Sequence, residues 1–258
     1  MIDLAQIESF YPESLRPFKR NLLREYLQYK ILEAIYDSEF GARLNFMGGT
    51  AIRIIYGNTR FSEDLDFDDL GLNGDEFDRL TGMIQRRLKL EGYEVEVKNV
   101  FRKAFTCEIR ILGVLFAYGL SGHRQEKLLV KLNAIPQDFS YLPDKIILNK
   151  FDVFLRINVV PADVLLAQKI FAVFNRARPM GRDFYDIVFL VSKARPNIDY
   201  LRSKMKITDG ADLKRKLLKR CEGLDFELLA REVEPFLFMP SDAKRVREFR
   251  RYIEGIDL

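Results

Sequence analysis

Three kinds of residue are scarce in this chain, and each scarcity excludes a class of site. One histidine (His123), two cysteines (Cys107 and Cys221) and no tryptophan occur among its 258 residues. A structural zinc site needs about four Cys or His ligands, which this chain can hardly supply. The two cysteines also exclude a disulfide scaffold and are typical of a reducing compartment. A Ser-His-Asp or Cys-His mechanism would depend on His123 alone, so carboxylates, lysines and a metal are the remaining candidates.

Long apolar segments are missing as well. The longest apolar run, Ile111–Leu120, contains two glycines and is about half the roughly 20 residues that a membrane span needs. The first residues lack a basic segment followed by an apolar one, so we expect no signal peptide. The 42 basic and 38 acidic residues leave a net charge of +4, which permits nucleotide or nucleic-acid ligands without requiring them. We therefore expect a cytoplasmic protein without a membrane segment.

Hydrophobic spacing predicts an α+β chain with a mixed sheet in its first two thirds and helices in the rest. We expect strands at Leu44–Met47, Asp64–Asp68, Tyr93–Val100, Phe105–Leu112, Val114–Tyr118 and Leu128–Ala134. We expect helices at Ser14–Tyr36, Ala51–Tyr56, Asp75–Leu90, Ala162–Ala177, Asp183–Lys193, Asp212–Cys221 and Asp242–Ile256. A turn at Gly113 should make a hairpin, and Pro136–Phe151 should be irregular. The change of character near Val160 predicts one domain over residues 1–160 and a helical domain over residues 161–258.

Gly48-Gly49-Thr50 and Asp64-Leu65-Asp66 are the segments best suited to chemistry. Carboxylates two apart on a strand point to one face, and Mg²⁺ favours such ligands while leaving room for substrate phosphates. Glycines let backbone N–H groups approach an anion, the following helix presents its positive end, and Thr50 adds a hydroxyl. Each motif alone is more often a tight turn or a solvated strand edge. In this order they indicate metal-assisted phosphoryl or nucleotidyl transfer.

Two sequence blocks resemble a known family. Residues 46–57, Phe-Met-Gly-Gly-Thr-Ala-Ile-Arg-Ile-Ile-Tyr-Gly, followed by Arg-Phe-Ser-Glu-Asp-Leu-Asp-Phe at 60–67, resemble the signature of AbiEii-type nucleotidyltransferases. These are toxins of type IV toxin–antitoxin and abortive-infection systems within the polymerase-β-like superfamily. The segments Ala167-Gln-Lys-Ile-Phe-Ala, Arg176 and Arg182-Asp-Phe-Tyr-Asp-Ile resemble the family's lysine helix and its Arg-Asp-x-Tyr-Asp segment. The resemblance spans roughly residues 40–195 and implies a polymerase-β-like domain followed by a helical domain.

The resemblance implies a role for each matching residue. The implied nucleotide ligands are Gly48, Gly49, Thr50, Arg53, Ser62, Lys169 and Arg182. Asp64 and Asp66 would bind Mg²⁺. Asp186 or Asp183 would complete the catalytic set by orienting Lys169 or Arg182, or by assisting the attacking hydroxyl. A solvated helix face remains the alternative for Lys169, and a helix cap for Arg182-Asp183.

Ser62 and Asn133 raise separate questions. Strand alternation places Ser62, two residues before Asp64, beside the predicted metal. There it is either a strand-edge hydroxyl or the acceptor of an inhibitory self-modification. Superfamily members usually carry a third carboxylate on a neighbouring strand, where this chain has Asn133. An amide is a poor general base, so either Asp68 or Asp186 replaces it, or activity is reduced or lost, or Asn133 is simply structural.

Basic residues gather late in the chain. Between Arg202 and Arg220 they outnumber acidic residues eight to two, and a second basic run occupies Lys244–Arg251. These segments would bind the phosphates of an RNA acceptor, or they are solvated basic helix faces.

We expect a Mg²⁺-dependent nucleotidyltransferase whose active site lies in the cleft between the two domains. An acceptor hydroxyl or phosphate would attack the α-phosphate of an NTP, and the resemblance implies the 3′ end of tRNA as acceptor. It also implies an antitoxin that need not contact the toxin. Three alternatives remain: an Asp-x-Asp glycosyltransferase, a haloacid-dehalogenase-type phosphatase, and a catalytically degenerate nucleotide- or RNA-binding module. The sequence block with Lys169 and Arg182-Asp183 argues against the glycosyltransferase. Asp68 argues against the phosphatase, whose motif usually has Thr or Val at that position.

Overall fold

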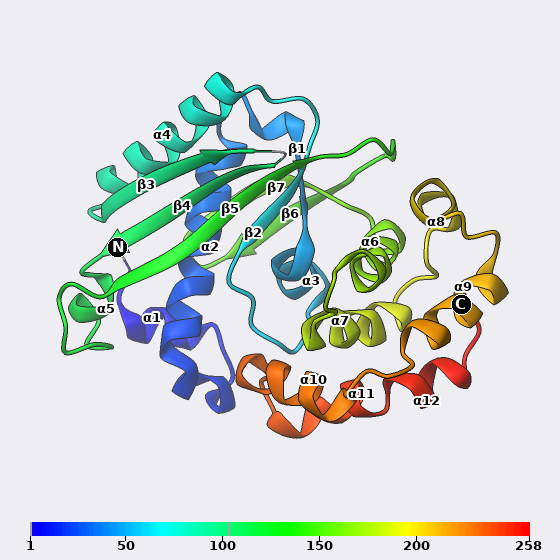
Figure 1. The fold of residues 1–258 in the computed structure, drawn as a ribbon. Helices are drawn as coiled ribbons and strands as arrows, with labels where there is room; N and C mark the ends of the chain where they lie inside the picture. Colours follow the sequence, from blue (N-terminus) through cyan, green and yellow to red (C-terminus); the bar gives the residue numbers. More distant parts are fainter. Residues whose placement is uncertain (1, 103) are drawn as a thin grey trace. The chain divides into compact units, whose positions relative to one another are not determined.

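Residues 2–102 and 104–258 are described by the structure, a computed structural model of the chain. They form two compact units that alternate along the sequence (Figure 1). The first unit contains the residues up to 51 together with 62–138 and 143–159, and the second contains Ile52–Phe61, Phe139–Leu142 and Val160–Leu258. The segment Ile52–Phe61 therefore belongs to the second unit although its flanking residues belong to the first. The division into domains 1–160 and 161–258 stays a prediction.

A seven-stranded mixed sheet forms the centre of the first unit. Its strand order is β3-β4-β5-β2-β1-β7-β6. The pairs β2–β5 and β1–β7 are parallel, and the other pairs are antiparallel. The strands are β1 (Leu44–Met47), β2 (Leu65–Asp69), β3 (Glu94–Phe101), β4 (Phe105–Leu112), β5 (Lys127–Pro136), β6 (Asp144–Lys150) and β7 (Val153–Val159). This sheet and its helices confirm the predicted α+β class.

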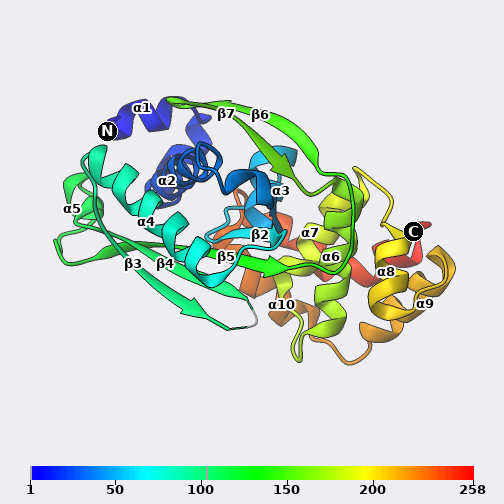
Figure 2. The ribbon, with the colours of Figure 1, turned by 90° about the horizontal axis from the view of Figure 1, so that it is seen from above.

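Two helices pack side by side on one face of the sheet (Figures 1 and 2). α2 (Lys19–Tyr36) contacts β5 and β7, and α4 (Gly74–Leu90) contacts α2, β3 and β4. The ring of Phe77 on α4 lies 5.3 Å from the ring of Phe105 on β4, which identifies the covered face. Because successive strand residues point to opposite faces, Thr106, Asn133 and Asp66 project from the other face.

The connection from β1 to α3 (Gly48–Tyr56) is immediate. We predicted that three residues would separate the strand from a helix starting at Ala51, and this was wrong because the helix begins at Gly48. Gly48 has φ +77°, a conformation that costs a residue with a Cβ roughly 1–2 kcal/mol. The glycine thus turns the chain from strand to helix in a single step, and the predicted phosphate cradle becomes the first turn of α3.

The second unit consists mainly of helices. They are the second half of α3, α6 (Ala162–Asn175), α7 (Gly181–Val191), α8 (Ile198–Met205), α9 (Gly210–Arg220), α10 (Phe226–Val233), α11 (Lys244–Arg247) and α12 (Phe249–Glu254). α7 packs against α6, α10 and α11. The ring of Phe184 on α7 lies 5.3 Å from that of Phe226 and 4.8 Å from that of Phe249, so an aromatic cluster forms part of the core of this unit.

Most predicted helices are confirmed, with boundaries shifted by a few residues, but two predictions about continuity were wrong. Residues 13–18 form a 3₁₀ helix before α2 rather than the start of one long α-helix, since Pro17 lacks the N–H that an interior helical residue donates. Asp242–Ile256 is divided into a 3₁₀ turn, α11 and α12. α8 and α10 were not predicted.

Two predictions in the sheet region were also wrong. Val114–Ala117 forms the short helix α5, not the second strand of a hairpin, and β4 pairs with β5 instead. A short apolar run does not distinguish a strand from a buried helical turn. Within the supposedly irregular Pro136–Phe151, β6 forms the edge of the sheet. Its residues are mostly exposed, as is typical of an edge strand, so no apolar alternation marked it.

In the described part of the chain, no helix is both long and apolar enough to cross a membrane.

Candidate active site

Asp66 on β2 packs directly against the start of α3. A Cβ built on Gly48 would lie 2.9 Å from the Asp66 Cβ and 3.1 Å from its Cγ, and closer still to Oδ2. The pairing of Met47 with Asp66 across β1 and β2 produces this approach. Only glycine leaves room for the carboxylate here. Gly48 and Asp66, which were predicted separately for phosphate and metal binding, are therefore in direct contact.

Thr50 and Asp64 are joined through the backbone. The Thr50 hydroxyl donates a hydrogen bond to the Asp64 carbonyl, and Thr50 is fully buried. The hydroxyl therefore fixes the chain just before β2. The predicted role of Thr50 in nucleotide binding stays a prediction. The contact to the nucleotide would come from the backbone N–H groups of Gly49 and Thr50 at the start of α3.

Asn133 lies beside Asp66 in the parallel pair β2–β5. Its Nδ2 donates to Asp66 Oδ1 over 2.9 Å, and its Oδ1 accepts from the Thr106 hydroxyl over 3.0 Å. The residue is therefore at the predicted site, and in this arrangement its amide is a hydrogen-bond donor to a carboxylate. It is not placed to act as a base.

The donor set fits a magnesium ion that keeps open positions. Asp64 and Asp66 are half-buried and two residues apart. Over residues 2–102 and 104–258, no group of three or more His, Cys, Asp or Glu side chains is arranged to hold a metal. Mg²⁺ is commonly held by one or two carboxylates and takes its other ligands from water and substrate phosphates. Asp64 and Asp66 would hold it, and it would polarise a phosphate and neutralise charge developing there.

The segment before Asp64 is held by α2. Gln28 Nε2 donates to the carbonyls of Ser62 and Glu63 over 3.0 Å each, and Arg24 forms a 2.9 Å ion pair with Glu63. Gln28 is buried, as are Glu25 and Lys30 among the polar and charged side chains of α2. Ser62 is half-buried, and its predicted self-modification stays a prediction.

A second cluster, which we call the Asp186 cluster, comprises Asp186, Arg60, Asn58, Lys169 and Asp183 and lies within the second unit. Arg60 donates from Nε and Nη2 to the two Asp186 oxygens over 2.6 Å each. Asn58 Nδ2 donates to Asp186 Oδ1 over 2.9 Å. Lys169 Nζ lies 2.9 Å from Asp186 Oδ2 and 3.5 Å from Asp183 Oδ1. Lys169 and both predicted acidic partners are thus brought together.

Electrostatics keep Asp186 and Arg60 charged although both are buried. Burial raises the pKa of Asp186, yet the positive charges of Arg60 and Lys169 outweigh it and hold that pKa below its ordinary value. Burial lowers the pKa of Arg60, and the Asp186 carboxylate more than compensates, so that this pKa is raised. Asp186 is consequently an anion at neutral pH with both oxygens occupied. These contacts suit the orienting role predicted for it better than proton transfer.

Two other predicted nucleotide ligands have different surroundings. The Arg53 guanidinium donates to the Asn58 carbonyl over 3.2 Å and lies 4.5 Å from the centre of the Phe238 ring. Arg182 is half-buried in the first turn of α7. Arg53 therefore supports the segment that carries Asn58 and Arg60, and nucleotide contacts of both arginines stay predictions.

The segment Asn58–Phe61 is hydrogen-bonded to the residues after α10. The Phe61 N–H donates to the Phe236 carbonyl over 2.8 Å, and the Phe238 N–H donates to the Thr59 carbonyl over 3.1 Å. The Phe61 and Phe238 rings are 4.6 Å apart. Only Ser62 and Glu63 separate Phe61 from Asp64 in the chain. The sequence pattern assigned no role to Arg60, because its partner Asp186 lies 126 residues away in the chain.

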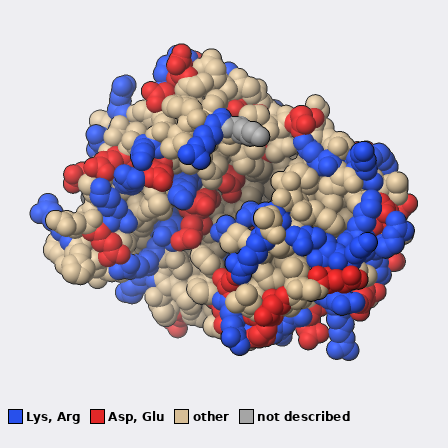
Figure 3. All heavy atoms as spheres, in the orientation of Figure 1, with Lys and Arg blue, Asp and Glu red and all other residues tan. Residues whose placement is uncertain are grey.

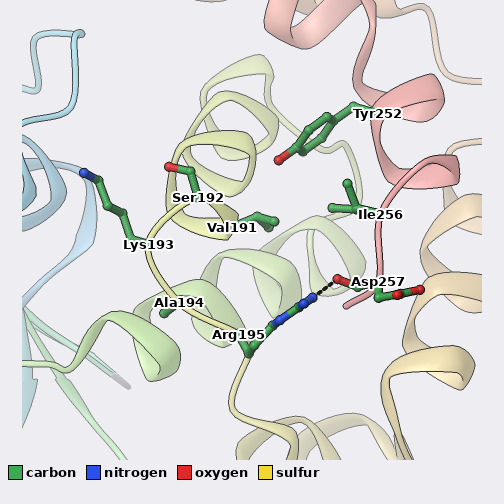
Figure 4. Close-up of a pocket in the computed structure, with 8 residues that line it drawn as sticks. All are labelled: Val191, Ser192, Lys193, Ala194, Arg195, Tyr252, Ile256 and Asp257. Atoms are coloured by element: carbon green, nitrogen blue, oxygen red, sulfur yellow. Dashed lines mark hydrogen bonds between the residues drawn. The ribbon is translucent and has the colours of Figure 1, made fainter.

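A hollow of about 570 Å³ in the second unit is lined by the end of α7, the following turn and the C-terminal residues. Figure 4 shows Tyr252 and Arg195 directed into it and Lys193 directed away, with the Arg195 guanidinium donating to the Asp257 carbonyl. None of the predicted site residues lines it, so it adds nothing to the candidate active site.

Comparison with known families identifies the chain. The model of the "Nucleotidyl transferase AbiEii toxin, Type IV TA system" family matches residues 30–255. The chain belongs to the AbiEii nucleotidyltransferase toxin family. The match includes both sequence blocks on which the resemblance rested and extends through the helices that follow them. The predicted membership is confirmed.

Solved structures support the fold of this AbiEii family member. JHP933 from Helicobacter pylori matches with a TM-score of 0.57 and 19% identity, covering 90% of this chain and 91% of that one. A second H. pylori protein, provisionally described as a nucleotidyltransferase, matches with a TM-score of 0.56 and 19% identity, covering 90% and 93%. At this identity the likeness concerns the fold. No curated protein sequence gives a significant match.

Gly48→Ala tests the close approach between α3 and Asp66. The new Cβ must displace Asp66 in addition to adopting a positive φ, and overpacking of this kind costs roughly 1–3 kcal/mol. Gly57→Ala is the matched control, because Gly57 also has φ +77° while no described atom lies within 4 Å of its Cβ. We expect chemical denaturation to show a larger loss of stability for Gly48→Ala by about that amount. Equal losses would contradict the packing described here.

Proposed function

We propose that this AbiEii family member is a Mg²⁺-dependent nucleotidyltransferase that transfers NMP from an NTP to an RNA acceptor, with the 3′ end of tRNA as the specific target. The observation that carries the proposal is the Asp66 carboxylate packed against the first turn of α3, with Asp64 two residues before it. A carboxylate pair beside a helix N-terminus combines cation and phosphate binding in one short stretch of chain.

The chain's own residues would mainly bind and orient. The N–H groups of Gly49 and Thr50 would receive triphosphate oxygens, and Asp64 and Asp66 would hold the cation that accompanies the nucleotide. Lys169, whose side chain is 14% exposed, would supply positive charge to the phosphates while Asp186 fixes its position. The acceptor oxygen would form a bond to the α-phosphorus as the bond to pyrophosphate breaks. Positioning and charge neutralisation would supply most of the rate.

A basic surface on the second unit supports an RNA acceptor. Figure 3 shows Lys and Arg side chains gathered over α8 and α9. The exposed basic residues on this surface include Arg202, Lys206, Arg215 and Lys219. Arg215 and Lys216 pair with Asp212, and Arg202 pairs with Asp199, so these partners reduce the charge without removing it. Such a surface would bind phosphates with strong salt dependence.

As a toxin of this family the protein is expected to act in the cytoplasm, where NTPs and tRNA occur. We propose that its antitoxin opposes it without obligatory contact.

The deciding experiment incubates the purified protein with Mg²⁺, total tRNA and each α-³²P-labelled NTP in turn, beside the Asp66→Asn variant. Label on tRNA that is lost in the variant supports the proposal and identifies the nucleotide. Label on the protein alone contradicts the RNA acceptor and directs attention to Ser62. No label, together with measured NTP binding, would indicate a non-catalytic nucleotide-binding module.

A further inference from the structure

A row of polar side chains crosses three neighbouring strands beside the candidate metal ligands. Thr106 on β4, Asn133 on β5 and Asp66 on β2 occupy paired register positions and share one sheet face. The Thr106 hydroxyl donates to Asn133 Oδ1 over 3.0 Å, and Asn133 Nδ2 donates to Asp66 Oδ1 over 2.9 Å. All three residues are half-buried. The row therefore connects a hydroxyl, an amide and a carboxylate in one chain of hydrogen bonds.

The orientation of the amide follows from the chemistry of its partners. An ionised carboxylate can only accept hydrogen bonds, so the NH₂ group of Asn133 must face Asp66. The opposite end of the amide then accepts the Thr106 proton. The end of the Asn133 amide that faces Asp66 is therefore the NH₂ group, which can neither ligate a cation nor remove a proton.

The row limits the freedom of Asp66. Oδ1 is held by Asn133, while Oδ2 lies against Gly48 at the start of α3. The carboxylate is thus confined from both sides by neutral groups. A second carboxylate at position 133 would instead repel Asp66 unless a cation or a proton separated them.

We propose that Asn133, locked by Thr106, is a positioning residue that holds the Asp66 carboxylate ready for a divalent cation. The inference rests on the proposed function in that Asp66 is taken as a metal ligand. Hydrogen-bond partners of metal ligands typically affect metal affinity 10–100-fold, because they determine the orientation in which the ligand is presented.

The test measures binding of Mn²⁺, a paramagnetic substitute for Mg²⁺, by electron paramagnetic resonance without nucleotide. We expect Asn133→Ala to weaken Mn²⁺ binding about 10–100-fold. Thr106→Val keeps Asn133 but removes the hydroxyl that fixes its amide, so it should weaken Mn²⁺ binding less. Asn133→Asp supplies a further carboxylate, so it should bind Mn²⁺ more tightly than Asn133→Ala. It should also lower the Tm of the metal-free protein, because two neighbouring carboxylates repel each other.

Asn99 offers a matched control on the same sheet. Its Nδ2 donates to Asp78 Oδ1 over 2.7 Å, so Asn99→Ala removes the same kind of bond away from Asp66 and should leave Mn²⁺ affinity unchanged. Asn99→Asp should destabilise the protein without rescue by Mn²⁺.

Two failures are distinguishable. If Asp66→Asn binds Mn²⁺ as well as the wild type, the proposed metal site itself is wrong. If Asp66→Asn abolishes binding while both Asn133→Ala and Thr106→Val retain wild-type affinity, the positioning role is overturned and the proposed function is untouched.

Discussion

Asp66→Asn is expected to reduce nucleotide transfer on the order of 10³-fold while leaving the protein folded. Loss of a single preorganised charge-stabilising contact commonly costs 10²–10³-fold in rate, and the cation that we propose Asp66 holds would be lost with it. The substitution preserves shape and keeps an oxygen that can accept from Asn133 Nδ2. The defect should therefore be electrostatic and not structural.

The measurement is a single-turnover rate with labelled NTP and the acceptor found in the labelling experiment, at several Mg²⁺ concentrations. Asp75→Asn is the matched control, since Asp75 is an exposed carboxylate in the first turn of α4 and its loss should leave the rate within about twofold. A rate of Asp66→Asn close to that of the wild type would contradict the assignment of Asp66 as a metal ligand.

Asp186→Asn is expected to be the most destabilising conservative change. It leaves the buried Arg60 without its counter-charge, and breaking a buried ion pair by removing one partner typically costs about 3–5 kcal/mol. For a chain of this size that corresponds to a fall in Tm of roughly 10 °C. Lys169 would lose its nearer carboxylate at the same time, so any activity should fall as well.

Chemical denaturation and calorimetry check this expectation. Asp199→Asn removes an exposed partner of Arg202 and should change the stability by less than about 1 kcal/mol. The pKa of Asp186 is held below its ordinary value, so its stabilisation is complete at neutral pH and disappears as the pH falls through that lowered pKa. The difference between wild type and variant should therefore shrink in acid. A variant as stable as the wild type at pH 7 would show that the Asp186 cluster does not hold the fold together.

Prediction of the fold succeeded where local patterning decides the structure. Alternation in β5 and the three-four spacing in α4 reflect one buried face each, so the sequence displays them directly. β6 escaped prediction because its mainly exposed edge position requires no apolar alternation, and its pairing with β7 is set by the rest of the sheet. α5 was misread because a buried turn and a buried strand share the same apolar composition.

By itself the sequence determined the family, the α+β class and the candidate residues for chemistry, because the Gly-Gly-Thr and Asp-x-Asp spacing is a local property. Only the tertiary structure decided what those residues touch. It placed Gly48 against Asp66, aligned Asn133 and Thr106 beside that carboxylate, and joined Arg60 to Asp186 across 126 residues. Such contacts depend on strand register and helix packing, which arise from the burial of apolar surface over the whole unit and leave no mark at the positions themselves.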